Sequence, residues 1–137
     1  MSKLVFKGGL KLENPYPTEE IDLIRIPLPD KVILPMQQSI GEQAKPIVGV
    51  GEHVLTGQVI ATIDDERCAP VHASISGKVV AIDEQVMAHQ SGLKALCITI
   101  ESDGKDDWVD TSIGCTEHYE LCTSETIYNK IRVSGIV

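Results

Sequence analysis

Three glycines set among short β-branched runs are the strongest constraint on how this chain folds. Gly51, Gly57 and Gly77 each separate such runs and stand directly before a polar residue. A tight turn with positive φ favours glycine at such a place. The glycines therefore predict that residues 48–82 form short, strongly bent strands and not a helix.

Between these glycines the side chains alternate with a period of two, which is typical of strands that bury one face. Pro70 cannot donate a hydrogen bond to a central ladder, so it is expected to begin a strand or to lie on an edge. The alternation predicts two pairs of opposed faces, Val59, Ala61 and Ile63 against Ile60, Thr62 and Asp64, and Val71, Ala73 and Ile75 against His72, Ser74 and Ser76.

The spacing V-x-x-G-x-x-V-x-x-G-Q at 48–58, followed by A-P and then G-x-V at 69–79, resembles the barrel-sandwich hybrid of biotinyl and lipoyl carrier domains. In those families a lysine at the tip between the two halves carries the cofactor. Here the tip reads Asp64, Asp65, Glu66, Arg67 and Cys68. An amide to biotin or lipoate needs a primary amine, so the resemblance is to the scaffold and not to the carrier chemistry.

Composition and charge narrow the classes of partner. The chain has 137 residues, 42% of them hydrophobic, which is enough for one core and favours a single domain. Its net charge of −8 argues against direct binding to nucleic acid or to an anionic membrane. The apolar runs fall far short of the roughly 20 residues that span a bilayer, and Met1–Gly9 does not resemble a signal peptide. We therefore expect a cytoplasmic location.

The residues that could carry chemistry are expected to be structural. Metal sites draw on closely spaced thiolates, whereas Cys68, Cys97, Cys115 and Cys122 form no C-x-x-C pair, so reduced, partly buried thiols are expected. No G-x-S-x-G nucleophile elbow accompanies the histidines. We predict no catalytic, cofactor-binding or metal-binding residues, with structural or solvated roles for His53, His72, Gln37, Gln38 and the acidic run Asp64 to Glu66.

Residues 1–47 are expected to form an N-terminal arm and edge strands packed on the sandwich. Phe6, beside a glycine pair, is expected to anchor the terminus, and the prolines within 14–18 favour an extended wrap. Prolines interrupt residues 21–36, so only short edge segments are predicted there, including a strand at Val32 to Leu34 after a turn at Pro29 and Asp30.

The sandwich is predicted to occupy residues 48–110. Residues 83–95 form a polar excursion with a turn at Ser91 and Gly92, and an alternating strand follows from Leu96 to Glu101. The S-D-G-K-D-D run after it predicts a turn, because no glutamate closes a calcium loop at the required offset. Trp108 is expected to cap the edge of the sandwich.

A helix is predicted from Ser124 to Ser134 within the last segment, residues 111–137. Thr123 or Ser124 caps it, Glu125 lies near its start, and Gly135 stands where it would stop. The segment is interpreted as a linker and terminal helix that lead to further domains beyond Val137, so that the chain looks cut.

Several separated motifs resemble the N-terminal region of the C subunit of the Rnf electron-transport complex. They are K-L-V-F-K-G-G at 3–9, I-P-L-P-D-K-V-I-L-P-M-Q-Q-S-I-G-E-Q-A-K-P-I-V at 26–48, G-E-H-V-L-T-G-Q at 51–58, A-P-V-H-A-S-I-S-G-K-V at 69–79 and I-R-V-S-G-I-V at 131–137. The resemblance implies a peripheral subunit on the cytoplasmic face of the bacterial inner membrane, in an ion-translocating ferredoxin:NAD oxidoreductase.

The same resemblance implies that the parent subunit binds FMN, NADH and two [4Fe–4S] clusters through segments after residue 137. This chain holds no G-x-G-x-x-G run that would cradle a phosphate. We expect a non-catalytic scaffold that docks onto the later domains of the subunit or onto other subunits of the complex. Two alternatives remain, a carrier domain with an unusual attachment site and a fragment of a membrane-fusion-type adaptor.

Overall fold

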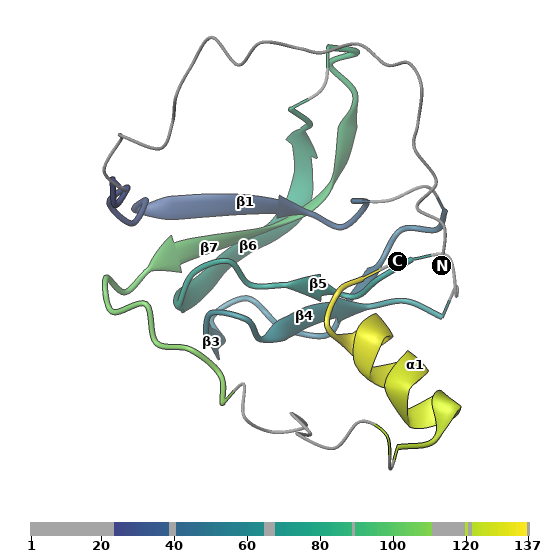
Figure 1. Ribbon diagram of the computed structural model, residues 1–137. Helices are drawn as coiled ribbons and strands as arrows, with labels where there is room; N and C mark the ends of the chain where they lie inside the picture. Colours follow the sequence, from purple (N-terminus) through teal and green to yellow (C-terminus); the bar gives the residue numbers. More distant parts are fainter. Residues whose placement is uncertain are drawn as a thin grey trace, which may run out of the picture.

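The computed structural model describes residues 24–38, 41–64, 68–88, 90–110, 120 and 122–136. Within them the chain is mainly β, with one short helix near the C-terminus (Figure 1). The elements in chain order are β1 (Lys31–Pro35), β2 (Lys45–Pro46), β3 (His53–Val54), β4 (Val59–Thr62), β5 (Val71–His72), β6 (Gly77–Val86), β7 (Lys94–Ser102) and α1 (Ser124–Val133).

The strands form two antiparallel sheets, one in the order β1-β7-β6-β3 and one in the order β2-β4-β5. The predicted class, a barrel-sandwich hybrid of short bent strands with a C-terminal helix, is confirmed. β1 lies on an edge, as the prolines of residues 21–36 predicted. Phe6 and residues 14–18 lie outside the described residues, and the boundaries at 47/48 and 110/111 stay predictions.

β7 lies between β1 and β6 and contributes Ile98 and Ile100 to the core. Cys97, Ile98, Thr99 and Ile100 are all buried, so both faces of this strand are covered, although its sequence alternates. Across the ladder Val79 pairs with Ile100, and both side chains are fully buried. The core cluster that closes between the two sheets also includes Val54, Ile60, Val71, Ala73 and Ile75.

The two predicted alternations are each interrupted once. Ile60 and Ala61 are both fully buried, because the ladder between β4 and β5 shifts register between Val59 and Ala61 as at a β-bulge. In the second run the apolar set is buried as predicted, but Ser76 is also buried, at 1% exposure. Pro70 directly precedes β5, as expected.

The three glycines all take positive φ, with values of 94° at Gly51, 82° at Gly57 and 157° at Gly77. Gly77 is also required by space. A Cβ at this position would lie 1.9 Å from the carbonyl oxygen of Glu101 on the neighbouring β7. Only glycine therefore lets β6 begin against β7.

The polar excursion predicted at 83–95 is wrong at both ends, where the strands continue. β6 continues to Val86 and β7 begins at Lys94, with Met87 N donating to Leu93 O beyond the last pair. The side chains there are polar because this ribbon has left the sandwich, not because the ladder ends. The predicted turn is confirmed, with Gly92 at a φ of 64°.

The predicted terminal helix is confirmed and ends one residue earlier than expected. Thr123 is the N-cap, and its hydroxyl accepts a hydrogen bond from Thr126 N at 3.2 Å. At the other end Gly135 N donates to Arg132 O and Ile136 N donates to Ile131 O, at 3.0 and 3.3 Å, with Gly135 at a φ of 83°. This is a Schellman motif, which turns the chain back toward the last turn of the helix.

Candidate functional site

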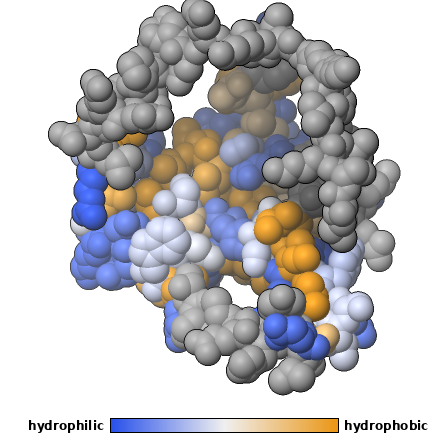
Figure 2. Space-filling view, in the orientation of Figure 1, coloured by the Kyte–Doolittle hydropathy of each residue, from blue (hydrophilic) through white to orange (hydrophobic). Residues whose placement is uncertain are grey.

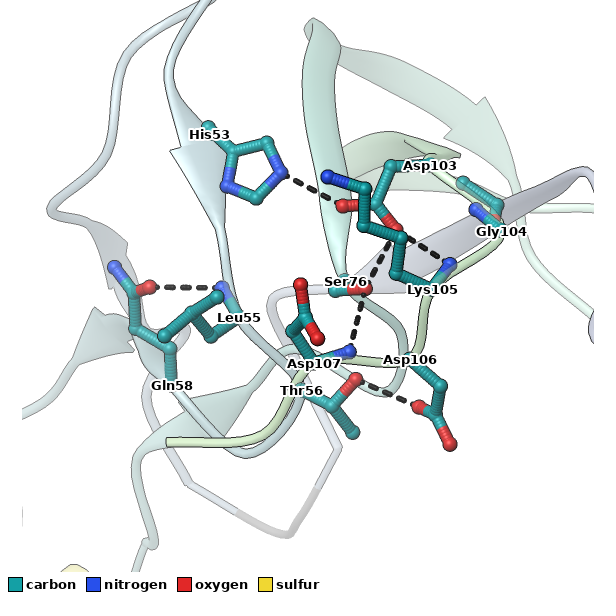
Figure 3. A network of polar contacts seen from close by, with 11 residues as sticks. His53, Leu55, Thr56, Gln58, Ser76, Asp103, Gly104, Lys105, Asp106 and Asp107 are labelled. Atoms are coloured by element: carbon teal, nitrogen blue, oxygen red, sulfur yellow. Dashed lines mark hydrogen bonds and ion pairs between the residues drawn. The ribbon is translucent and has the colours of Figure 1, made fainter. Parts of the chain in front are cut away.

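Two groups of side chains could carry a function, and each joins segments that lie far apart in the sequence. The first, called here the Asp103 network, comprises His53, Thr56, Ser76, Asp103, Asp106 and Asp107 (Figure 3). The second, called here the helix anchor, joins the end of α1 to β4 and β5 through Arg132, Val133, Gly135, Ile63 and His72.

The sheet order explains why the Asp103 network forms. β3 and β7 flank β6, so His53 on β3, Ser76 just before β6 and Asp103 just after β7 meet at one end of the sheet. His53 Nε2 lies 2.8 Å from Asp103 Oδ2, and Ser76 Oγ donates to Asp103 Oδ1 at 2.7 Å. Lys105 N also donates to Asp103 Oδ1, at 3.0 Å.

These donors favour the ionised carboxylate of Asp103. They lower its pKa to about 2, with the backbone hydrogen bond from Lys105 as the largest cause, followed by Ser76 and His53. The acidic turn is thus held as an anion against the end of the sheet.

The Asp103 network is not a catalytic triad, although it contains serine, histidine and aspartate. In a triad the histidine lies between the other two groups and takes the serine proton. Here the carboxylate lies between them, and Ser76 commits its proton to Asp103 while it accepts a hydrogen bond from Asp107 N at 3.0 Å. Ser76 is also only 1% exposed, so its hydroxyl has no access to a substrate.

The rest of the network fastens the following loop to the turn after β3. Thr56 Oγ1 donates to Asp106 Oδ1 at 2.9 Å, and Thr56 N donates to Asp107 O at the same distance. Trp108 lies beside the Gly57 turn, where an added Cβ would be 3.6 Å from its ring, but Trp108 itself stays 61% exposed. The network therefore acts as a structural clasp.

The cysteines in the described part of the chain do not present a ligand set. Cys68 and Cys97 are buried, and their thiols donate to backbone carbonyls, to Glu42 O at 3.7 Å and to Ala95 O at 3.3 Å. Burial raises the pKa of the Cys97 thiol, which disfavours the thiolate that binds iron or zinc. In the part of the chain that the structure describes, no three His, Cys, Asp or Glu residues are placed to hold a metal ion. Cys115 lies outside that part.

The helix anchor fixes α1 beside the connection between β4 and β5 (Figure 1). Arg132 Nη2 donates to Ile63 O at 3.0 Å, and His72 Nε2 lies 2.9 Å from Val133 O. A carbonyl only accepts, so His72 donates through Nε2. Gly135 packs on the same ring, since a Cβ there would be 3.3 Å from His72 Cε1.

A cavity of about 350 Å³ remains between α1 and the end of β4. Asp64 lies at its rim and is 99% exposed, 4.0 Å from the ammonium group of Lys45. The residues that line it are Thr62, Ile63, Asp64, Pro70, Asn129, Arg132 and Val133.

The structure brings together only some of the residues considered from the sequence. His53 and His72 lie in separate groups. Gln37 donates to the carbonyl of Gly41 at 3.4 Å, and Gln38 donates to the carbonyl of Pro35 at the end of β1 at 3.2 Å. The anchoring role of Arg132 was missed, because 69 residues separate it from Ile63 and a positive charge is favourable near any helix C-terminus, with or without a further contact.

The two bent sheets define the protein class, a barrel-sandwich hybrid whose tip lacks the lysine of a carrier domain. Residues 4–105 match the family model described as the RnfC barrel sandwich hybrid domain. The chain therefore belongs to the RnfC barrel-sandwich hybrid family, as its motifs predicted.

Relatives of similar sequence are each named as the C subunit of an ion-translocating oxidoreductase complex. The chain is 47% identical to that of Edwardsiella ictaluri and 39% identical to that of Serratia proteamaculans, over 96% of its own length in both cases. It is 41% identical to that of Rhodobacter capsulatus over 74% of its length. The matched residues make up only 16%, 18% and 20% of these relatives.

None of the helices in the described ranges is long and apolar enough to cross a membrane.

Proposed function

We propose that residues 1–137 are the N-terminal, non-catalytic scaffold and docking domain of the C subunit of an ion-translocating ferredoxin:NAD oxidoreductase complex. Its work is to present fixed surfaces to the later domains of the subunit and to other subunits. In this proposal the parent subunit lies on the cytoplasmic face of the bacterial inner membrane as a peripheral protein.

The helix anchor is the observation that carries the proposal. In the carrier families that the scaffold resembles, the tip between the two halves is exposed and its lysine takes the cofactor. Here the carbonyl of Ile63, next to that tip, accepts a hydrogen bond from Arg132 of α1, and His72 on β5 binds the carbonyl of Val133. The strand ends on either side of the place where a carrier holds its cofactor are thus tied to a helix, which favours docking over the carrier and adaptor alternatives.

The chemistry of the parent complex is assigned to segments outside these residues. FMN and NADH need phosphate-binding backbone at a glycine-rich turn, and the glycines here serve strand turns such as the one at Gly77. The buried Cys68 and Cys97 thiols, each bonded to a carbonyl, do not fit the ligand set of a [4Fe–4S] cluster. No step of the redox reaction is therefore assigned to this domain.

A binding titration tests the proposal. The 137-residue chain is titrated with FMN and with NADH, and the full-length subunit is titrated in parallel. No saturable binding is expected for the short chain, whereas the long one is expected to bind. Saturation of the short chain would contradict the proposal.

A deletion tests the docking role. A subunit that lacks residues 1–137 is expected to keep flavin binding and to lose its place in the membrane complex, as measured by co-purification with the other subunits. Normal assembly of the deleted form would refute a docking role for the domain.

A further inference from the structure

The outward surface of α1 carries an apolar stripe that the described chain leaves uncovered. None of the residues of α1 is buried. Ile127, Tyr128 and Ile131 are 36%, 49% and 45% exposed, and Ile127 and Ile131 lie one turn apart. Figure 2 shows apolar atoms gathered along α1 on the face toward the viewer.

Among the described residues, the helix is held mainly at its C-terminal end. The hydrogen bonds that tie it to the sandwich come from Arg132 and Val133 in the last turn, while the first turn relies on the local cap at Thr123. A helix of ten residues is marginal in water without tertiary packing of an apolar face. The stripe is therefore expected to pack against something further.

The end of the helix directs the following chain toward this stripe. The Schellman motif places Ile136 N 3.3 Å from Ile131 O, so the chain turns back at Gly135 instead of leaving along the helix axis. Ile136, which is 58% exposed, continues the apolar stripe.

We propose that the stripe formed by Ile127, Tyr128, Ile131 and Ile136 is the docking site for the polypeptide segment that directly follows residue 137 in the longer protein. This rests on the proposed function. The relatives contain much more polypeptide than the matched region, which makes up only 16% to 20% of their chains, and part of that additional chain is the proposed occupant. A tethered segment acts at an effective concentration in the millimolar range, which favours it over a second copy or a separate protein.

A photo-crosslinker on the stripe tests the proposal in the full-length subunit. Tyr128→p-benzoylphenylalanine keeps an aromatic ring at a half-exposed position, so folding is expected to survive. Irradiation followed by peptide mass spectrometry is expected to give an intramolecular crosslink to residues shortly after 137. The matched control is Val80→p-benzoylphenylalanine on β6, which is 38% exposed in the other sheet and is expected to give no such crosslink.

Three results would overturn the proposal. They are a crosslinked dimer, a crosslink from Tyr128 only to another protein, and no crosslink from Tyr128 beyond the level at Val80. A coding sequence that ends at Val137 would also overturn it. If the crosslink fails while the deleted subunit still fails to assemble, only the docking site is wrong and the proposed function stands.

Discussion

The β6–β7 hairpin and α1 are stabilised in opposite ways. At its base the hairpin buries Val79, Ile98 and Ile100 completely. α1 buries no residue, and within the described ranges hydrogen bonds from its last turn connect it to the sandwich. The sandwich thus draws its stability from its own side chains, whereas α1 is positioned by polar contacts and exposes its apolar residues. The burial at the base of the hairpin stabilises the domain itself, whereas the exposed apolar residues of α1 are available for contact with another segment.

The largest expected effect on the unfolding free energy comes from replacing Gly77, which the sandwich requires, and it is compared with the effect of replacing Gly49, which the sandwich does not require. Gly77→Ala forces a Cβ to within 1.9 Å of Glu101 O, so strands must separate, and we expect a loss of about 4 kcal/mol or more in unfolding free energy. Gly49→Ala is the control, because nothing lies within 4 Å of its added Cβ. Urea unfolding followed by circular dichroism measures both, and equal losses would remove the special role of Gly77.

The same isoleucine deletion in the two regions gives the next largest difference. Ile98→Ala empties a fully buried site in β7, and we expect a loss of about 3 to 4 kcal/mol. Ile131→Ala removes a 45% exposed side chain from α1, and we expect a change within about 0.5 kcal/mol in the 137-residue chain. Comparable losses in urea unfolding would show that α1 belongs to the cooperative core.

Asp103→Asn tests whether the ionised carboxylate of Asp103 stabilises the sandwich, through the pH dependence of the unfolding free energy. The native pKa of about 2 lies below the ordinary 3.8, so the unfolded chain binds more protons between these values and stability rises with pH there. The contribution is complete above pH 3.8 and is lost as pH falls through about 2. We expect a variant that is less stable than the parent at neutral pH, by a difference that shrinks below pH 3.8 and disappears below about pH 2, as measured by urea unfolding at a series of pH values. A difference that does not change with pH would contradict the ionised clasp.

The smallest effect is local to α1. Arg132→Ala removes the hydrogen bond to Ile63 O, and we expect about 1 kcal/mol less local stability, with faster amide exchange in α1 and no change in the sandwich. Lys130→Ala is the matched control, because it removes the same charge from the same helical turn. If both variants loosen α1 equally, the charge matters and the anchor does not.

Local patterns predicted the elements whose cause is local. Positive φ at Gly51 and Gly57 and the capped helix after Thr123 all follow from residues within a few positions of one another. The class of fold was predicted from the resemblance of the 48–79 motif to the barrel-sandwich hybrid, and the glycines themselves indicated only short, bent strands. The N-terminal arm stays untested, since residues 1–23 lie outside the described part of the chain.

Features that depend on distant partners could not be predicted. Ser76 is polar yet buried, because Asp103 reaches it from the end of β7. β6 continues to Val86 because β7 pairs with it along this whole length, although the polar side chains of β6 in this region suggest a loop. The hydrogen bond from Arg132 to Ile63 joins residues that are 69 positions apart, so no local sequence pattern indicates it.

Residue-resolved hydrogen exchange of the 137-residue chain is the most direct test of the central claim. It measures whether the sandwich is stable by itself while α1 opens locally. The amides of Val79, Ile98 and Ile100 are expected to exchange only with global unfolding, and those of Ile127 to Ile131 at least about tenfold faster, through local opening. Equal protection in β7 and α1 would show that the helix is already part of the core and would contradict the distinction between the two regions.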